Sequence, residues 1–315
     1  MKTPTALVAT IPAAFLFAAV FFIAPSSAQL QSEDFKISTN VNLVLLDVSV
    51  KDSKGGYVSN LTQGNFTIEE NGVPQKITTF VGKDVPVEAG LVLDASGSMR
   101  NKREQVNNAG LAFLDASNPH DQIFVVDFND KVRSALPDEV AFTDDIGILR
   151  TALSKHRTEG RTALYDAIAA ALKHLESGDR EKKTLLVVSD GGDNASNLTQ
   201  AEAMRMIEES KATIYTIGLA EPDDPDQNPG VLRRIAAISG GECFLLDKVE
   251  DVIPTSKKIA QDIRKRYTIG YIPDRGNGKA AVIRKIHVSA IAPDRGRLIV
   301  RTRTSYIDPR LIAEK

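Results

Sequence analysis

Between about residues 90 and 266, short apolar runs alternate with segments of helical periodicity, and this alternation constrains the fold more than any other feature. Residues 185–188 contain no polar side chain, which indicates a strand buried on both faces. Leu164, Ile168 and Leu172 recur four residues apart, so this helix has one apolar face. The pattern predicts βαβ units, and therefore an α/β fold with a doubly wound, mostly parallel sheet between helices.

The segments on either side of this region show only β patterns. Apolar residues alternate from 41 to 50, but their phase changes by one residue after Leu45, which predicts a β-bulge or a strand passing between two faces. Segments 66–68 and 77–80 flank Asn71-Gly72, so we expect them to form a hairpin.

Alternation returns after Arg266, where Tyr267, Ile269 and Tyr271 share one parity. Each β flank is too small to be stable alone, so we expect the two to pair as a smaller β-sandwich-like domain into which the α/β domain is inserted. The expected divisions are a signal peptide at 1–28, an N-terminal β segment at 29–85, the α/β domain at 86–266, and a C-terminal β segment at 267–315 that pairs with 37–82.

The first 28 residues resemble an export signal. Lys2 precedes an apolar run from about 6 to 24, and Pro-Ser-Ser-Ala28 provides small residues for cleavage near Ala28. The alternative is an uncleaved membrane anchor, since the run approaches spanning length. Both interpretations predict an exported chain, periplasmic or secreted, and no later stretch predicts membrane insertion after cleavage.

Composition narrows the possible functions. A formal net charge of −2 offers no electrostatic basis for binding nucleic acid. Cys243 is the only cysteine, so no intrachain disulfide is possible, and its apolar neighbours predict a small core residue. The four histidines share no metal-ligand spacing, which argues against zinc.

The candidate site begins where the apolar run 90–93 ends in Asp94, Ser96 and Ser98. A carboxylate and two hydroxyls on alternate residues suit a hard divalent cation, Mg²⁺ or Mn²⁺. The alternative is a strand-to-helix turn in which Ser and Asp only cap the helix. Two further loops are expected at the same sheet edge, where doubly wound folds bind ligands, and they carry Thr162 and Asp190.

Asp94-x-Ser96-x-Ser98, Thr162 on a later segment and the Asp190 of Ser-Asp-Gly resemble the metal-ion-dependent adhesion site of von Willebrand factor A-type domains. The resemblance covers about residues 86–266, and the whole chain resembles bacterial VWFA-related exported proteins with β flanks. It implies a Rossmann-like fold. It also implies Mg²⁺ or Mn²⁺ held by those five residues, with one coordination position left for a partner protein's carboxylate.

Several nearby residues have simpler interpretations. Asp166 is expected to face solvent or cap a helix, and Asp193 is expected to serve turn geometry more than the metal. Arg157 and Arg161 either meet an acidic partner or belong to a solvated loop. The acidic loop 221–226 contains two prolines and lacks the ligand spacing of a calcium loop.

The sequence therefore predicts an exported, non-enzymatic module that captures an Asp or Glu side chain of another protein through a divalent cation. Two alternatives remain. One is a structural envelope module whose metal only fixes loops. The other is a metal-dependent hydrolase or phosphoryl transferase with Asp94 as nucleophile, although Ser96 replaces the second carboxylate expected there.

Overall fold

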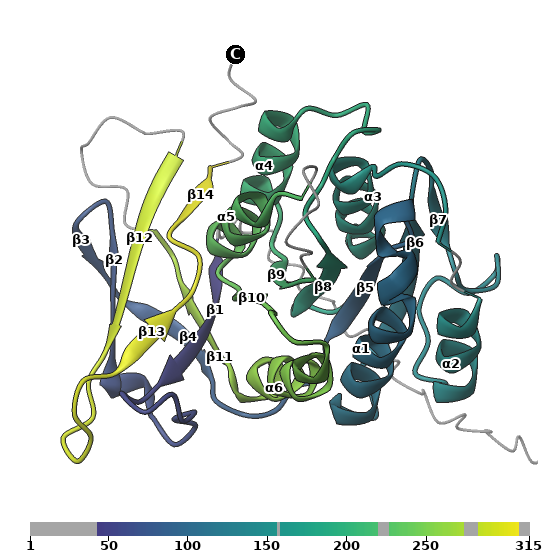
Figure 1. Cartoon of the computed structure of the whole chain (residues 1–315). Helices are drawn as coiled ribbons and strands as arrows, with labels where there is room; N and C mark the ends of the chain where they lie inside the picture. The colour runs from purple at the N-terminus through teal and green to yellow at the C-terminus, as the bar shows by residue number, and fades with distance from the viewer. Residues whose placement is uncertain (1–42, 156–157, 220–226, 274–282, 309–315) are drawn as a thin grey trace, which may run out of the picture. The chain divides into compact units, whose positions relative to one another are not determined.

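The computed structural model describes residues 43–155, 158–219, 227–273 and 283–308. Its centre is a six-stranded sheet in the order β10-β9-β8-β5-β6-β7 (Figure 1). All neighbouring strands in it are parallel except β7, which pairs antiparallel with β6. These strands are β5 (Glu88–Asp94), β6 (Gln122–Phe128), β7 (Val132–Ser134), β8 (Lys183–Ser189), β9 (Thr213–Gly218) and β10 (Cys243–Leu245).

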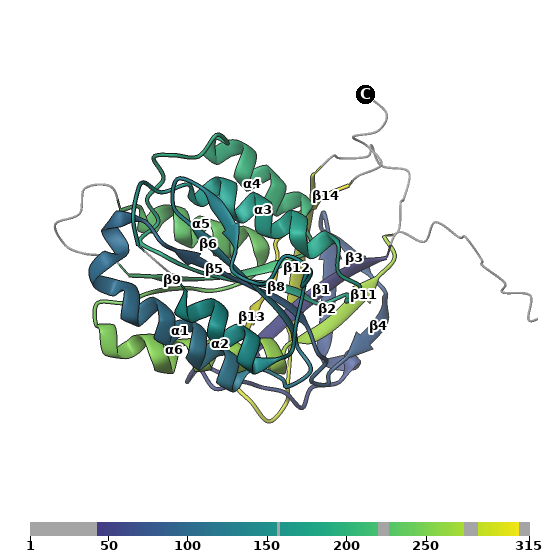
Figure 2. The ribbon, with the colours of Figure 1, turned by 90° about the vertical axis from the view of Figure 1, so that its right-hand side faces the viewer.

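Helices cover both faces of this sheet, as Figures 1 and 2 show. One layer contains α1 (Arg103–Ala116), α2 (Ile146–Ser154) and α6 (Val252–Lys265), and the other contains α3 (Leu164–Glu176), α4 (Gln200–Glu209) and α5 (Pro229–Ser239). A 3₁₀ turn, Gly97–Lys102, leads into α1. The predicted doubly wound α/β architecture is confirmed.

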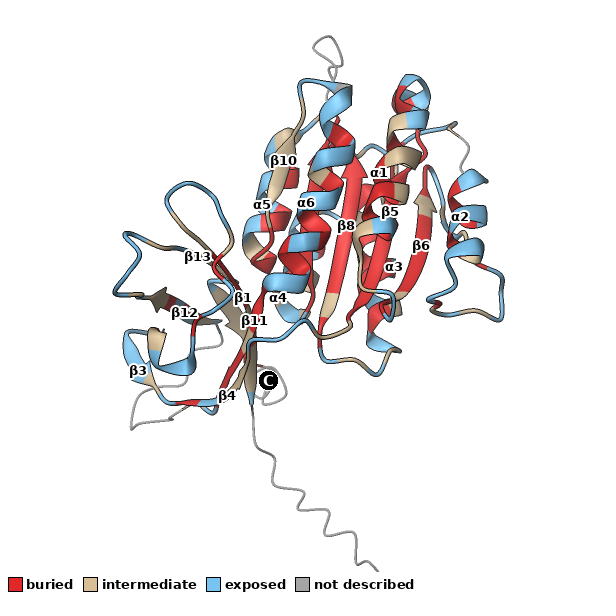
Figure 3. Ribbon diagram, turned by 90° about the horizontal axis from the view of Figure 1, so that it is seen from below, coloured by how far each residue is buried: buried red, intermediate tan, exposed pale blue. Residues whose placement is uncertain are grey.

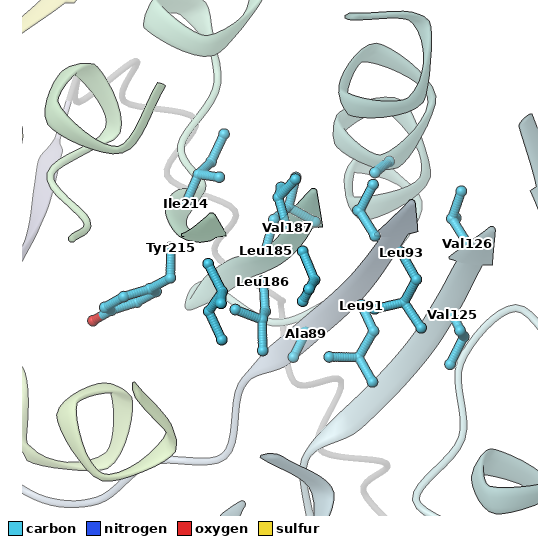
Figure 4. Packing of buried hydrophobic residues seen from close by; sticks show 14 of the residues in the cluster. Ala89, Leu91, Leu93, Val125, Val126, Leu185, Leu186, Val187, Ile214 and Tyr215 are labelled. Carbon is cyan, nitrogen blue, oxygen red and sulfur yellow. The ribbon is translucent and has the colours of Figure 1, made fainter. Parts of the chain in front are cut away.

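The core lies between the central sheet and its helices. Strands β5 and β8 are buried along nearly their whole length (Figure 3). Leu91 of β5 pairs with Leu186 of β8 and with Val125 of β6, so the three side chains share one face of the sheet (Figure 4). This burial on both faces explains why the strand sequences are continuous apolar runs. It also holds the carboxyl ends of β5 and β8 rigidly side by side.

The remaining strands form two antiparallel sheets. The first has the order β13-β1-β11-β4 and the second β14-β12-β2-β3, and their facing sides share a second apolar core. The strands are β1 (Val44–Lys51), β2 (Phe66–Glu70), β3 (Val73–Gln75), β4 (Ile77–Val81), β11 (Tyr267–Tyr271), β12 (Ile283–Ala290), β13 (Ile299–Arg301) and β14 (Ser305–Ile307). Each sheet thus contains strands from before and from after the α/β region, and in the first sheet they alternate.

The predicted hairpin of 66–68 with 77–80 is wrong. Asn71 and Gly72, both at positive φ, do form a turn, but it joins β2 to β3. Strand β4 instead crosses to the other sheet and pairs with β11. The turn residues were identified correctly, but the short segment Val73–Gln75 is largely exposed and had no apolar pattern to mark it as a strand.

The phase change in β1 has a clear structural basis. Leu46 and Val48 are fully buried in the core between the two antiparallel sheets. Leu45 lies on the opposite face of the same strand, since successive side chains of a strand point to opposite sides. The strand therefore presents apolar residues to two faces, one of which is the sandwich core.

Arg266 joins the α/β region to the β sheets. It is 2% exposed, and its guanidinium donates to the Tyr215 hydroxyl (2.7 Å) and to the backbone carbonyls of Gly240 (2.7 Å) and Asp47 (3.0 Å). Asp262, one helical turn earlier, accepts from Tyr215 and from Ser49 Oγ of β1 (2.5 Å). Strands β9 and β1 are thereby tied to the end of α6 by a buried polar network.

No helix among the described residues is both long and apolar enough to cross a membrane. The predicted signal peptide, Arg157, the acidic loop 221–226 and the expected turn at 274–278 lie outside the described residues. Cys243 is half-buried at the edge of the α/β core, so it packs on the core rather than inside it.

Candidate metal centre

The candidate site lies where strand order reverses in the central sheet. From β5 the chain proceeds to β6 on one side and later to β8 and β9 on the other. Asp94 is the last residue of β5, and Asp190 directly follows Ser189, the last residue of β8. In open α/β sheets, the crevice at this switch point is the usual place for a ligand.

Both carboxylates are held by short hydrogen bonds. Asp94 accepts from the Ser96 amide at Oδ1 (2.9 Å) and from the Ser189 hydroxyl at Oδ2 (2.6 Å). Asp190 accepts from the Ser98 hydroxyl at Oδ2 (2.7 Å). The hydroxyls of Ser96 and Ser98 lie 3.1 Å apart, so a continuous set of oxygens runs from one loop to the other.

Thr162 belongs to a third loop that is tied to both of the others. The Gly97 amide donates to the Gly160 carbonyl (2.9 Å), which joins this loop to the one after β5. The Thr162 amide donates to the Asn194 side chain (2.9 Å), and the Thr162 carbonyl accepts from the Asn194 amide (2.9 Å), which joins it to the loop after β8. The structure therefore brings the three predicted loops together.

Two glycines shape these loops. Gly160 has φ +78°, and a Cβ there would lie 2.1 Å from Asp130 Oδ2. Gly191 has φ +86°, and a Cβ there would lie 2.4 Å from the Asn228 carbonyl oxygen. Both positions combine a left-handed backbone with a close contact, so any other residue would displace a loop that carries a candidate ligand.

The electrostatics of the site are dominated by two buried carboxylates. Asp94 is fully buried and Asp190 is 3% exposed. Burial raises the pKa of Asp94 to about 6, the nearby Asp190 carboxylate raises it too, and hydrogen bonds from Ser189 and Ser96 oppose the rise. Within the described part of the chain, no Lys, Arg or His forms an ion pair with either carboxylate.

The donor set fits a hard divalent cation. Two carboxylates and three hydroxyls supply only oxygen, which suits Mg²⁺ or Mn²⁺ and not zinc. The described residues contain no group of three or more His, Cys, Asp or Glu side chains placed to hold a metal, so a cation here would also need the hydroxyl oxygens. Ser98 is exposed while Asp94 and Thr162 are buried, so the site opens to solvent on the Ser98 side.

Neighbouring acids serve the loops. Asp193 accepts from the Tyr165 amide (3.0 Å) at the start of α3. Asp166 accepts from the amides of Asn197 (2.9 Å) and Leu198 (3.0 Å), as expected for a capping residue. Both carboxylates use their oxygens to hold the loop after β8 against α3.

Arg161 forms an ion pair with Asp130 (3.0 Å) at the protein surface. Hydrogen bonds from Arg161 lower the pKa of the exposed Asp130 carboxyl. Arg161 directly precedes Thr162 in the sequence, and its side chain stays 68% exposed in this ion pair.

The role of Ser189 was not predicted from the sequence. Its hydroxyl donates to Asp94 and accepts from the Gly191 amide (3.0 Å), so it positions one candidate ligand while shaping the loop of another. The only available signal was its place directly before Asp190. The parallel pairing of Leu93 with Val188 makes it the neighbour of Asp94, and that register is a tertiary property.

Comparison with known proteins agrees with this architecture. Residues 90–192 match the family described as the von Willebrand factor type A domain. A von Willebrand factor type A structure from Catenulispora acidiphila superposes with a TM-score of 0.52 at 14% identity, covering 85% of this chain and 75% of that one. No curated protein matches the chain in sequence.

Two further structures are similar over a smaller part. An aerotolerance-related membrane protein from Bacteroides fragilis gives a TM-score of 0.46 at 18% identity, over 57% of this chain and 99% of that one. The von Willebrand factor domain of a type V pili tip protein from Porphyromonas gingivalis gives 0.47 at 14% identity, over 57% and 95%.

The family match thus falls within the central α/β region, which this chain combines with two additional antiparallel sheets. The predicted family resemblance is confirmed.

Proposed function

We propose that this protein is an exported, non-enzymatic binding module that captures a partner protein through a divalent cation, Mg²⁺ or Mn²⁺. The residues that would hold the cation are Asp94, Ser96, Ser98, Thr162 and Asp190. The observation that carries the proposal is a pair of buried carboxylates, Asp94 and Asp190, that meet with the Ser96 and Ser98 hydroxyls at the switch point of the sheet. A buried charge of this kind is costly unless it is paired or coordinates a metal.

The five proposed ligands are of two kinds, charged carboxylates and neutral hydroxyls. Asp94 and Asp190 supply two negative charges, which balance a divalent cation. Ser96, Ser98 and Thr162 add neutral oxygens, so the bound cation keeps an affinity for a further anion. Ser189 and the Ser96 amide hold Asp94 in place before any ligand arrives.

When bound, the cation would supply an electrophilic position for an Asp or Glu carboxylate of the partner. Ser98 is the exposed member of the set, so we expect the partner to approach from its side. Asp94 is poorly suited to act as a nucleophile, because it is fully buried and both of its oxygens accept hydrogen bonds. We therefore favour binding over hydrolysis or phosphoryl transfer.

The location is part of the proposal. The charged, apolar and small-residue regions of residues 1–28 support export to the periplasm or cell exterior, with cleavage near Ala28.

Isothermal titration of Mg²⁺ and Mn²⁺ into the purified mature chain tests the metal site. We expect one site per chain in the wild type and none in Asp94→Ala. Asp166→Ala is the matched control, since it removes a nearby carboxylate that holds a loop and is not a candidate ligand. Metal binding that persists in Asp94→Ala would place the site elsewhere.

A pull-down from the envelope of the source organism, with Mg²⁺ and with EDTA, tests partner capture. We expect a partner that is retained with Mg²⁺, released by EDTA and lost with Asp94→Ala. If the cation stabilises the protein against heat but no partner depends on it, then the metal only fixes loops and the protein is a structural module.

A further inference from the structure

A cavity lies at the opposite end of the central sheet from the candidate metal centre. Its volume is about 660 Å³, within the usual range for small-molecule sites. One wall consists of residues just before β5, β8 and β9, at the amino ends of those strands. The other wall is the face of sheet β13-β1-β11-β4 that points away from the sandwich core. The cavity therefore belongs to neither domain alone.

The sheet wall is apolar. Leu43 and Leu45 line the cavity, on the face of β1 opposite to the buried Leu46, and Val81 of β4 lies across the sheet from them. Gly270 of β11 lies between β1 and β4, and a Cβ there would lie 3.0 Å from Leu45 and 3.1 Å from Leu43. Its lack of a side chain lets both leucines lie flat on the sheet. Leu43 is left 40% exposed.

The other wall carries positive charge. Arg180, Lys182 and Lys211 line the cavity, with Glu181 as the only acidic lining residue. Lys182 is 6% exposed, and its ammonium lies 4.0 Å from Asp47 Oδ1, so its charge is already balanced. The Arg180 guanidinium donates to the Val87 carbonyl (3.5 Å), and its charge opposes the rise that burial causes in the pKa of Asp121. Lys211 has no carboxylate within ion-pair distance among the residues that the structure describes.

An apolar wall facing a wall with three basic residues and one acidic residue is complementary to an amphipathic anion. We propose that this cavity binds a monocarboxylate with an extended apolar tail, of the fatty-acid class. The tail would lie along Leu43, Leu45 and Val81, and the carboxylate would face Arg180 and Lys211. A polar ligand would leave the leucines in contact with water. A cation would be repelled by the basic residues at the rim of the cavity, Arg180 and Lys211.

Isothermal titration of decanoate into the mature chain, below its micelle concentration and with EDTA present, tests this assignment. We expect saturable binding of one decanoate per chain. Decyltrimethylammonium has the same tail and the opposite charge, and acetate has the charge without the tail. Both should bind at least about tenfold more weakly, a difference of about 1.4 kcal/mol.

Two rim variants each change the charge by one unit, in opposite directions. Lys211→Gln should weaken decanoate binding about three- to tenfold, whereas Glu181→Gln should leave it equal or tighter. Both residues are exposed, so neither change should disturb folding. Thr79→Trp, on the sheet wall, should block binding by filling the cavity, and its thermal unfolding shows whether the fold is kept.

The assignment would be overturned by the absence of saturable binding to the wild type, or by equal binding of decyltrimethylammonium. It would also be overturned if folded Thr79→Trp bound decanoate normally. Asp94→Ala should bind decanoate as the wild type does, because the two sites lie at opposite ends of the sheet. Failure of the metal-site proposal would therefore leave this one standing.

Discussion

The buried Asp94 carboxylate should destabilise the metal-free protein at neutral pH. Its pKa is about 6 in the folded state, against an ordinary value of 3.8, mainly because burial disfavours the charge. Between these two values the folded state holds the proton that the unfolded state has lost. The free energy of unfolding should therefore fall as pH rises from about 4 to about 6, and this cost should stay constant above pH 6.

The size of the effect follows from the shift. About two pH units at about 1.4 kcal/mol each correspond to a cost of about 3 kcal/mol at pH 7.5. Asp94→Asn removes the charge and keeps the shape, so the metal-free variant should be more stable than the wild type by up to about 3 kcal/mol. In a domain of this size, that is a rise in Tm of about 5–10 °C. The difference should vanish near pH 4.

The assay is thermal and urea unfolding of both proteins in EDTA at pH 4 and pH 7.5, repeated with Mg²⁺ at pH 7.5. Magnesium should stabilise the wild type and leave Asp94→Asn unchanged. Asp193→Asn is the control, because that carboxylate holds the start of α3 and its loss should destabilise the protein at neutral pH. A metal-free Asp94→Asn protein less stable than the wild type at pH 7.5 would refute the reasoning.

Three further substitutions have defined outcomes. Arg266→Met leaves the buried Asp262 without its cation and should cost about 3–5 kcal/mol in urea unfolding; a loss below 1 kcal/mol would mean that the network adds little. Gly191→Ala places a Cβ 2.4 Å from the Asn228 carbonyl oxygen and should lower Mg²⁺ affinity measured by titration, while unchanged affinity would show that the loop adapts. Thr199→Ala removes the hydroxyl cap of α4 and should cost about 1 kcal/mol without changing metal affinity.

The candidate site was largely visible in the sequence. Apolar runs that end in Asp94 and just before Asp190 identify the carboxyl ends of two buried strands, and parallel strands end at one edge. The structure ties the loops of both residues to that of Thr162 by hydrogen bonds from Gly97 to Gly160 and from Thr162 to Asn194. Ser189 was missed as a positioning residue, because its contact with Asp94 depends on strand register.

The pairing of strands within the β flanks, in contrast, could not be predicted from the sequence. The turn at Asn71-Gly72 is a local signal, and it was located correctly. The strand expected to pair across this turn, β4, was predicted wrongly. It pairs with β11, nearly 190 residues later, and not with β2. Pairing over such a distance depends on which apolar faces can be buried together, and no local pattern records it.

The sequence by itself determined the α/β class of the central region and the position of its candidate site. Helical and strand periodicities are short-range properties, and each polar residue that ends an apolar run can be identified from its immediate sequence neighbours. Only the tertiary structure decided which strands pair, how Arg266 joins the two regions, and that Leu43 and Leu45 face a cavity with a basic rim. Those outcomes depend on burial and charge balance between segments far apart in the chain, which become defined only when the whole fold is assembled.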